Sequence, residues 1–529
     1  MSEDHKLQRP FRADYLSRRD FMAQTTAIGA AATLGTGLLG RPAQASPQQG
    51  GHFKLGIGSG STTDTLDPAH IESTWNQNFC FGTLRNALTN VEPSGDLGPE
   101  LAESWEASDD ATQWTFNLRK DVTFHSGKTM ESEDVIASLR HHMGEDSKSA
   151  GKALLADVAN MEADGKNRVI ITLNGGNADF PFLMSDYHFC ILPSKDGHAD
   201  AHSGDGTGPY VLENFDPGVK GLAKRNPNYF KSGMPYFDSV ELIAIQDPVA
   251  RTNAMTTGEV HIMDRCDLKT VHLLKRHPDV DVTEVTGTLH YTFPMRTDMA
   301  PFDNNDVRLA LKYAVNREEL VAKILRGYGG LGNDHPISTA NRYHASNLAQ
   351  RNYDPDKAKF HLKKAGAEGL RVELSAADAA FAGAVDSAVL MREHAAAAGI
   401  TIDVVREPND GYWSNVWMKK AWCACYWSGR PTEDLMFSTE YARGVPWNDS
   451  FWDHDLFNEL LVQARAELDT TKRRAMYEEM QEIVRDEGGV LIPMFANYVG
   501  ANSTKLGHAT IGSNYDMDGA KVTERWWFV

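Results

Sequence analysis

LGPELAESWEASDDATQWTFNLRKDVTFHSGK, residues 97 to 128, is the stretch of this 529-residue chain that most directly indicates its fold. Within it, Trp114 to Arg119 alternate apolar and polar side chains, as in a half-buried strand. Asp121 to Gly127 are rich in turn formers, and Ser132-Glu133-Asp134-Val135 just beyond predicts the first turn of a helix running toward His142. A strand, a turn and a helix in close succession indicate an α/β unit.

Strands and helices alternate over the rest of the chain as well, with no internal repeat and no long linker. This predicts interwoven α/β lobes, between which the chain crosses more than once. Further strands are expected at 53–58, 168–173 and 240–245, and helices at 307–314, 317–326, 358–365, 384–398 and 464–485.

Composition indicates a folded, acidic protein. The chain has 53 Lys and Arg against 72 Asp and Glu, a net charge of −19, and 41% hydrophobic residues. These values exclude disorder and collagen-like repetition, and the negative charge opposes a nucleic-acid partner. The longest basic cluster, Lys472-Arg473-Arg474, is interpreted as the solvated face of a helix.

The amino terminus has the pattern of a twin-arginine export signal. Ser17-Arg18-Arg19-Asp20-Phe21-Met22 precedes a weakly apolar run, and Ala43-Gln44-Ala45 is a small-x-small cleavage signal. We therefore expect cleavage after Ala45 and a periplasmic mature protein. Because Ser46 and not Cys follows, and because no other apolar run is long enough to span a bilayer, no lipid or membrane anchor is expected.

Catalytic and metal-binding motifs are missing from the sequence. It has no G-x-S-x-G, P-loop, H-E-x-x-H or C-x-x-C motif, and its 19 His residues are scattered. We expect no enzyme activity, no cofactor and no metal site. Five cysteines form no regular disulfide framework and are interpreted as buried small side chains: Cys80, Cys190, Cys266, Cys423 and Cys425.

Aromatic residues crowd the segment 412–452, which favours a binding function, because aromatic walls supply apolar contact at low entropic cost. Most of these rings are nevertheless expected to pack in the core.

Residues 97–128 resemble the signature of the family 5 extracellular solute-binding proteins, the peptide- and nickel-type receptors of ABC importers. Further matches follow in order along the chain: TLDP at 65–68, GTGPY at 206–210, RNPNY at 225–229, TGEV at 257–260 and PFDNNDVRLAL at 301–311. The resemblance covers essentially the whole mature chain.

The resemblance implies an α/β, two-lobed periplasmic binding protein with interlobe crossover strands and an extra subdomain inserted in the first lobe. It also implies that the lobes close on a small molecule or peptide, and that ABC permease subunits recognise the closed form. We expect a monomer. The expected boundaries are 1–45 for the signal peptide, 46–85 and 206–287 for the first lobe, 86–205 for the inserted subdomain, 288–496 for the second lobe and 497–529 for a return to the first lobe.

The segment expected to anchor the ligand departs from that of the family's peptide receptors. In the family's peptide receptors an Asp of the second lobe pairs with the peptide's amino terminus. Alignment on the oligopeptide type places Cys425 at that position, and alignment on the dipeptide type places Arg430 there. An Arg suits a carboxylate, so an anionic ligand is one hypothesis, with Arg296 as a second contact.

Structural alternatives remain for both arginines. Arg430 can instead pair with Glu433 or Asp434, and Arg296 with Asp298. Asp434 or Glu433 can also replace the missing Asp after a small shift, which keeps a peptide ligand open. Two further alternatives are a ligand sensor that feeds a chemoreceptor or two-component system and a nickel-type metal-chelate receptor.

Five tryptophans complete the candidate site. Trp427 is expected beside Arg430, and the other candidate walls of the cleft are Trp413, Trp417 and Trp447 from the second lobe and Trp75 from the first.

Overall fold

The computed structural model describes residues 47–149, 151–409 and 412–529. The predicted export signal and its cleavage point after Ala45 lie outside these residues. None of the described helices is both long enough and apolar enough to span a bilayer.

The first lobe is built on a seven-stranded mixed sheet. Its central strand β1 (His52–Ile57) pairs in parallel with β12 (Ser239–Ala244) and β13 (Ile262–Met263). The remaining strands are β10 (Tyr210–Asp216), β11 (Lys220–Arg225), β14 (Val280–Val285) and β21 (Tyr498–Ser503). Helices of this lobe are α2 (Thr74–Phe79), α5 (Pro248–Thr256), α6 (Val271–Leu274), α15 (Asp516–Gly519) and α16 (Val522–Arg525).

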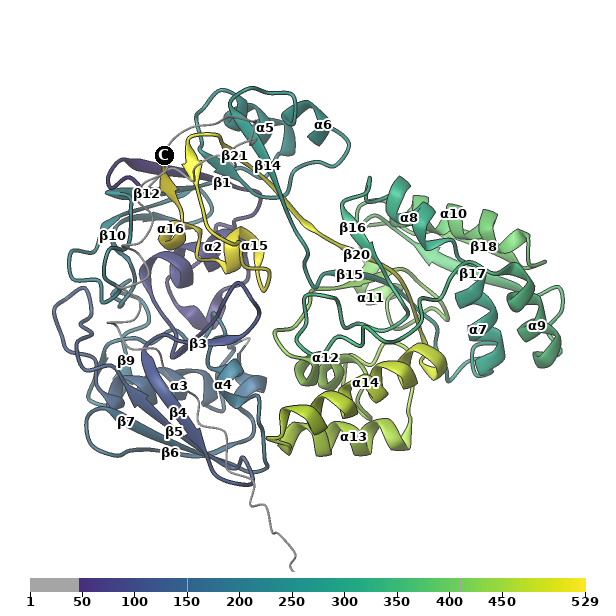
Figure 1. Ribbon diagram of the computed structural model, residues 1–529, viewed down its shortest axis with the longest axis horizontal. Helices are drawn as coiled ribbons and strands as arrows, with labels where there is room; N and C mark the ends of the chain where they lie inside the picture. Colours follow the sequence, from purple (N-terminus) through teal and green to yellow (C-terminus); the bar gives the residue numbers. More distant parts are fainter. Residues whose placement is uncertain (1–46, 150, 410–411) are drawn as a thin grey trace, which may run out of the picture. The chain divides into compact units, whose positions relative to one another are not determined.

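A separate four-stranded antiparallel sheet forms between β1 and β10 in the sequence (Figure 1). Its order is β4 (Ala102–Ala107), β5 (Gln113–Leu118), β7 (Arg168–Leu173) and β6 (Val158–Ala163), with α3 (Ser132–Met143) and α4 (Phe180–Leu183) completing its core. The segment 97–128 thus supplies two strands of this sheet: β5, where the alternation of residues 114–119 predicts a strand, and β4, which was not predicted. Short hairpins flank it: β2 (Thr89–Val91) with β3 (Leu97–Pro99), and β8 (Ser194–Lys195) with β9 (His198–Ala199).

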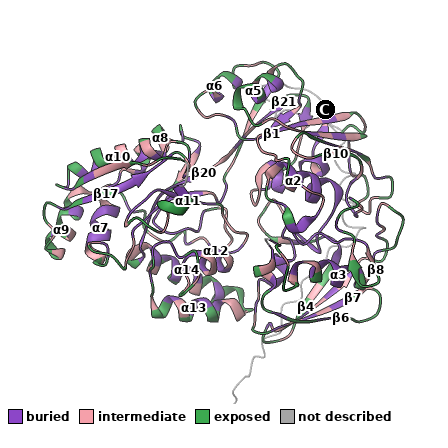
Figure 2. Cartoon of the chain, turned by 180° about the vertical axis from the view of Figure 1, so that it is seen from behind, coloured by how far each residue is buried: buried purple, intermediate pink, exposed green. Residues whose placement is uncertain are grey.

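The second lobe contains a four-stranded sheet and a parallel strand pair. The sheet has the order β16 (Gly329–Leu331), β20 (Val490–Ala496), β15 (His290–Pro294) and β19 (Cys425–Trp427), and the pair is β17 (Arg371–Ala376) with β18 (Thr401–Arg406). Its helices are α7 (Asn305–Tyr313), α8 (Arg317–Lys323), α9 (Pro355–Ala365), α10 (Ala384–Ala396), α11 (Tyr412–Asn415), α12 (Glu433–Glu440), α13 (Asp455–Ala466) and α14 (Thr470–Glu487). Figure 2 shows exposed positions on the outer faces of α9, α10 and α13.

The chain passes between the two large sheets along two adjacent antiparallel paths. β14 belongs to the first-lobe sheet and β15, which follows it, to the second-lobe sheet. The return runs from β20 to β21, and these strands pair antiparallel with β15 and β14 respectively (Figure 1). The crossover therefore consists of residues 286–289 beside Asn497.

Two expectations about the second lobe are wrong. The single helix expected at 464–485 is two helices, because the side chain of Asp469 caps α14 by accepting hydrogen bonds from the backbone N–H groups of Thr471 and Lys472. Within the cluster expected on a solvated face, Arg473 is buried, and its partner is described below. The five cysteines are free and buried, as predicted.

Candidate ligand-binding site

Arg430 lies in the loop between β19 and α12, beside the crossover. Gly429 packs so closely on Thr288 that a β-carbon at this position would overlap the Thr288 side chain. Arg430 is partly buried, and its Nη1 donates a hydrogen bond of 2.8 Å to the Ser428 carbonyl oxygen. Within the described residues, no carboxylate forms an ion pair with it.

The alternative ion pairs of Arg430 are not formed, because both acids have other partners. The Glu433 carboxylate accepts a hydrogen bond of 2.6 Å from the backbone N–H of Tyr343. Asp434 lies 3.1 Å from Nε of Arg465. Both acids therefore have partners in the scaffold and neither pairs with Arg430, while Asp434 as a ligand contact stays a prediction.

Groups from the first lobe face Arg430. Burial lowers the pKa of Arg430, and Tyr187, Asp186 and Tyr515 act against that shift from the first lobe, as does Glu440 from the second. The rings of Tyr187 and Tyr515 meet edge to face with centroids 5.4 Å apart. Arg430 thus lies where polar and charged groups of both lobes come near one another.

Four of the predicted tryptophans, Trp413, Trp417, Trp427 and Trp447, form one connected group beside Arg430. Ring centroids are 5.8 Å apart between Trp413 and Trp417, 6.4 Å between Trp417 and Trp427, and 6.0 Å between Trp427 and Trp447. The Arg430 guanidinium lies 6.0 Å from the Trp427 ring. Trp427 is buried, whereas Trp413 and Trp447 are exposed, so the tryptophan group extends from the interior to solvent.

Asp449 links two members of the tryptophan group. Its Oδ2 accepts hydrogen bonds from the indole Nε1 atoms of Trp417, at 3.0 Å, and Trp427, at 3.4 Å. Its Oδ1 has no hydrogen-bond partner, although the residue is only 2% exposed. Burial raises the pKa of Asp449 to about 6, against the two indole hydrogen bonds, which lower it.

Glu440, at the end of α12, is a second buried acid beside Asp449. It is 1% exposed, and neither of its carboxylate oxygens meets a hydrogen-bond partner in the part of the chain that the structure describes. Burial raises its pKa well above the ordinary value, and the neighbouring Asp449 raises it further. Cys425, predicted at the anchor position, is buried next to these two acids. Burial is the main cause that raises the pKa of its thiol, and the carboxylates of Asp449 and Glu440 raise it further.

Two other predicted residues lie outside this site. Trp75 is fully buried in the core of the first lobe, where its Nε1 donates a hydrogen bond of 3.0 Å to the Leu242 carbonyl oxygen, so it is not a wall of the cleft. Arg296 adopts its structural alternative: Nη2 lies 2.6 Å from Asp298, and the guanidinium lies 4.0 Å from the Phe451 ring. The Arg296 guanidinium, which was expected to bind an anion, is therefore already paired with the Asp298 carboxylate.

Sequence reasoning missed Asp449, Glu440, Tyr187 and Tyr515. No local pattern identifies the first-lobe tyrosines, because they reach the site only through the tertiary fold. Asp449 lies within the aromatic-rich segment 412–452, so this segment was the one available signal for it. Within the described residues, no group of three or more His, Cys, Asp or Glu side chains is placed to hold a metal ion.

Two α/β lobes that share crossover strands and contribute jointly to a charged, aromatic site define a two-lobed solute-binding protein. This chain belongs to family 5 of the bacterial extracellular solute-binding proteins. The family model described as "Bacterial extracellular solute-binding proteins, family 5 Middle" matches residues 96–449. The resemblance inferred from the sequence motifs is therefore confirmed.

Individual relatives are distant. The chain is 25% identical to the probable D,D-dipeptide-binding periplasmic protein DdpA of Escherichia coli K12, over 84% of this chain and 89% of that protein. It is 28% identical to the nickel-binding periplasmic protein of the same strain, over 55% of this chain and only 57% of that protein. The structure of DppA from Helicobacter pylori in complex with the peptide STSA has a TM-score of 0.73 at 23% identity, and the match covers 91% of this chain and 99% of that one. That likeness confirms the expected two-lobed fold.

Proposed function

We propose that this protein is the periplasmic substrate-binding component of an ABC importer and that it captures a small carboxylate-bearing solute between its lobes. Closure on the ligand presents a form that the permease recognises, and no bond of the ligand changes, so the protein is not an enzyme. The proposal includes export by the twin-arginine route, cleavage after Ala45, a monomeric state and the lobe boundaries given above. Family membership supports the periplasmic binding role.

The ligand class rests on one observation, the unpaired guanidinium of Arg430. A partly buried cation without a counterion favours an anionic ligand group, because ligand binding then supplies the missing charge. Its planar fork matches a carboxylate in a bidentate geometry. The neighbouring tryptophan group supplies flat apolar surface for the rest of the ligand.

A peptide is the second candidate, and Asp449 favours it. In the oligopeptide-type alignment Cys425 stands at the position of the family's amine-binding Asp, and the Asp449 carboxylate lies beside that cysteine and influences its pKa. An ammonium group at this place would find a carboxylate and indole rings together. A peptide with a free amino terminus would then use Asp449 for its amine and Arg430 for a carboxylate.

Thermal unfolding of residues 46–529 against a ligand panel tests the proposal. The panel contains dipeptides, oligopeptides, opine-like and sugar acids, betaines and nickel chelates, applied after co-purified ligand has been removed by partial unfolding. A ligand at 100 times its Kd adds about 2.7 kcal/mol to the stability of the folded state and raises Tm. We expect carboxylate-bearing compounds to raise Tm and Arg430→Ala to weaken their binding by roughly 10- to 100-fold.

Arg392→Ala is the matched control, because Arg392 is an exposed second-lobe arginine paired only with its neighbour Glu393. This variant should bind like the wild type. If only peptides with free amino termini raise Tm, and Arg430→Ala binds them normally, Arg430 is structural and the anionic class is wrong. If only nickel chelates bind, the metal-chelate alternative replaces both candidates.

A further inference from the structure

Asp179 belongs to the inserted subdomain, yet its carboxylate has no partner there. The residue immediately precedes α4, and its neighbours Phe180 and Leu183 pack in the core of that subdomain. Its side chain does not cap α4, and it accepts no hydrogen bond from any described residue of the first lobe. The residue is nevertheless only 1% exposed.

Both partners of the Asp179 carboxylate come from the second lobe. Arg473 of α14 donates a hydrogen bond of 2.7 Å from Nη1 to Oδ1, and its Nη2 lies 2.6 Å from Oδ2. Arg342 donates a second hydrogen bond to Oδ1, at 2.9 Å from its Nη2. Two guanidinium groups thus meet one carboxylate across the lobe interface, Arg473 through one hydrogen bond and one close ion contact and Arg342 through one hydrogen bond. This contact explains why Arg473 is buried and not solvated.

Neighbouring contacts extend this pair into a patch between the lobes. The backbone N–H of Ala178 donates a hydrogen bond of 2.7 Å to the carbonyl oxygen of Arg465 on α13. The Arg342 guanidinium lies 4.6 Å from the first-lobe Phe182 ring. Leu435 of α12 packs against the core of the inserted subdomain. None of these contacts involves Arg430 or the crossover residues 286–289.

The second lobe holds the arginines in place independently of Asp179. Arg473 donates a hydrogen bond of 2.9 Å from Nε to the Ala464 carbonyl oxygen and lies 5.4 Å from the Tyr477 ring. Arg342 lies 4.4 Å from the Tyr343 ring. Because the arginines are preorganised, formation of the ion pair requires only that the lobes meet.

We propose that Asp179, Arg342 and Arg473 form an interlobe latch that stabilises the closed form whether or not a ligand is present. The inference rests on the proposed function, in which the lobes open and close. When the lobes separate, the latch breaks and its three charged groups are hydrated. The latch therefore sets the closed fraction of the free protein, and this fraction scales the apparent affinity for every ligand of the site.

Asp179→Asn tests the latch cleanly, because this substitution removes no first-lobe contact in the open form. Spin labels on Lys166→Cys in the inserted subdomain and Arg392→Cys in the second lobe report the distance between the lobes, and the native cysteines are buried. In the ligand-free protein we expect wild type to populate a short-distance form, and Asp179→Asn to reduce the ratio of closed to open molecules at least tenfold. Arg342→Met, which keeps an apolar stem beside Phe182, should reduce it severalfold.

Asp164→Asn is the matched control, because Asp164 lies in the same subdomain and pairs only with Arg168, 2.8 Å away, within that subdomain. Its distance distribution should match that of the wild type. The latch is overturned if Asp179→Asn also leaves the distribution unchanged, or if the ligand-free wild type contains no closed form. A single distance in every variant, with and without the ligand panel, would instead contradict lobe closure and with it the proposed function.

Discussion

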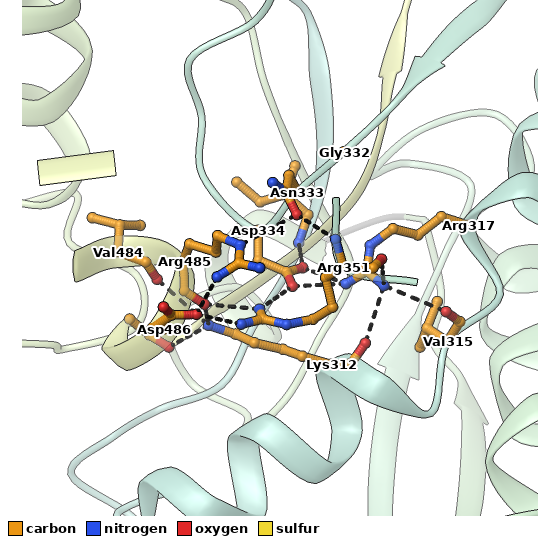
Figure 3. Close-up of polar contacts among 12 residues, drawn as sticks. Lys312, Val315, Arg317, Gly332, Asn333, Asp334, Arg351, Val484, Arg485 and Asp486 are labelled. Carbon is orange, nitrogen blue, oxygen red and sulfur yellow. Dashed lines mark hydrogen bonds and ion pairs between the residues drawn. The ribbon is translucent and has the colours of Figure 1, made fainter. Parts of the chain in front are cut away.

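Two buried acid centres of the second lobe differ in what balances their charge. Asp334 is fully buried and lies 2.7 Å from Arg317 and 2.6 Å from Arg351 (Figure 3). The backbone N–H of Ile492 donates a further hydrogen bond of 3.0 Å to its carboxylate. Burial alone would raise the pKa of Asp334, but the two arginines hold it below its ordinary value. Glu440 and Asp449 are buried to a similar degree, yet within the described residues no Lys, Arg or His forms an ion pair with either.

The difference is between a buried charge that the chain itself balances and buried acids that it leaves without an ion pair. A buried charge that the chain itself neutralises can hold segments in register, as Asp334 holds α8 and β20 through Arg317 and Ile492. A buried acid without a counterion destabilises the fold and shifts its own pKa upward. Such a group is retained more readily where a ligand supplies the missing partner, and Glu440 and Asp449 lie beside the tryptophan group and Arg430.

The largest effect is expected at the balanced centre. Asp334→Asn keeps the size of the side chain but removes its charge, which leaves Arg317 in the interior without a counterion and Arg351 with Asp486 alone. Breaking such a buried pair should lower the free energy of unfolding by about 3 to 5 kcal/mol. Urea unfolding at pH 7, followed by circular dichroism, measures the loss.

Asp356→Asn is the control for this substitution. The Asp356 side chain is 92% exposed and contacts only Lys359, so the change should be below about 0.5 kcal/mol. A loss below about 1 kcal/mol for Asp334→Asn would show that the two centres do not differ in the way described.

A smaller effect of opposite sign is expected at the unbalanced centre. The pKa of Asp449 is about 6 in the folded protein, raised from an ordinary 3.8, so the unfolded chain releases its proton first as the pH rises. The contribution of Asp449 to the stability of wild type therefore falls between about pH 4 and pH 6, by about 1.4 kcal/mol for each unit of the pKa difference. Asp449→Asn retains an oxygen that accepts the indole hydrogen bonds and removes this loss.

Relative to wild type, Asp449→Asn should gain about 2 to 3 kcal/mol between pH 4 and pH 8. Parallel urea titrations at the two pH values measure the change. Asp334→Asn is the internal comparison: since the folded-state pKa of Asp334 is lowered, its contribution to stability is present above its ordinary pKa and is lost as the pH falls. The penalty of that variant should shrink at low pH, and equal pH trends for the two variants would contradict the assignment.

Local patterns predicted the scaffold well and the site only in part. Alternation placed the strands β1, β5, β7 and β12, and helical periodicity placed α3, α7, α8, α9 and α10, because these signals depend on neighbours in the sequence. Position in the family pattern identified Arg430, and aromatic density identified the tryptophan group. The single helix expected at 464–485 failed because a lone Asp469 ends one helix and caps the next.

The remaining errors concern contacts between distant segments. Asp449 and Cys425 are separated in the sequence by α12 and the segments on either side of it, so no spacing rule relates them. The position of Arg473 in a basic cluster on α14 predicts a solvated side chain. It is buried because the first lobe contacts it through Asp179. Trp75 was assigned to the cleft by its position after a motif, although its ring is fully buried in the first lobe's core with Phe79 and Phe215.

The smallest effect on the free energy of unfolding is expected where a carboxylate is paired but exposed to solvent. Arg371 on β17 and Asp403 on β18 form two hydrogen bonds, of 2.6 and 2.9 Å, while their side chains are 71% and 38% exposed. Because water already solvates both charges, Asp403→Asn should cost only about 0.2 to 1 kcal/mol, despite a geometry as close as that around Asp334. The cost should nearly vanish in 1 M salt, where the screening length is about 3 Å. Urea titrations at low and high salt measure it, and a salt-independent loss of several kcal/mol would show that pairing, and not burial, governs these centres.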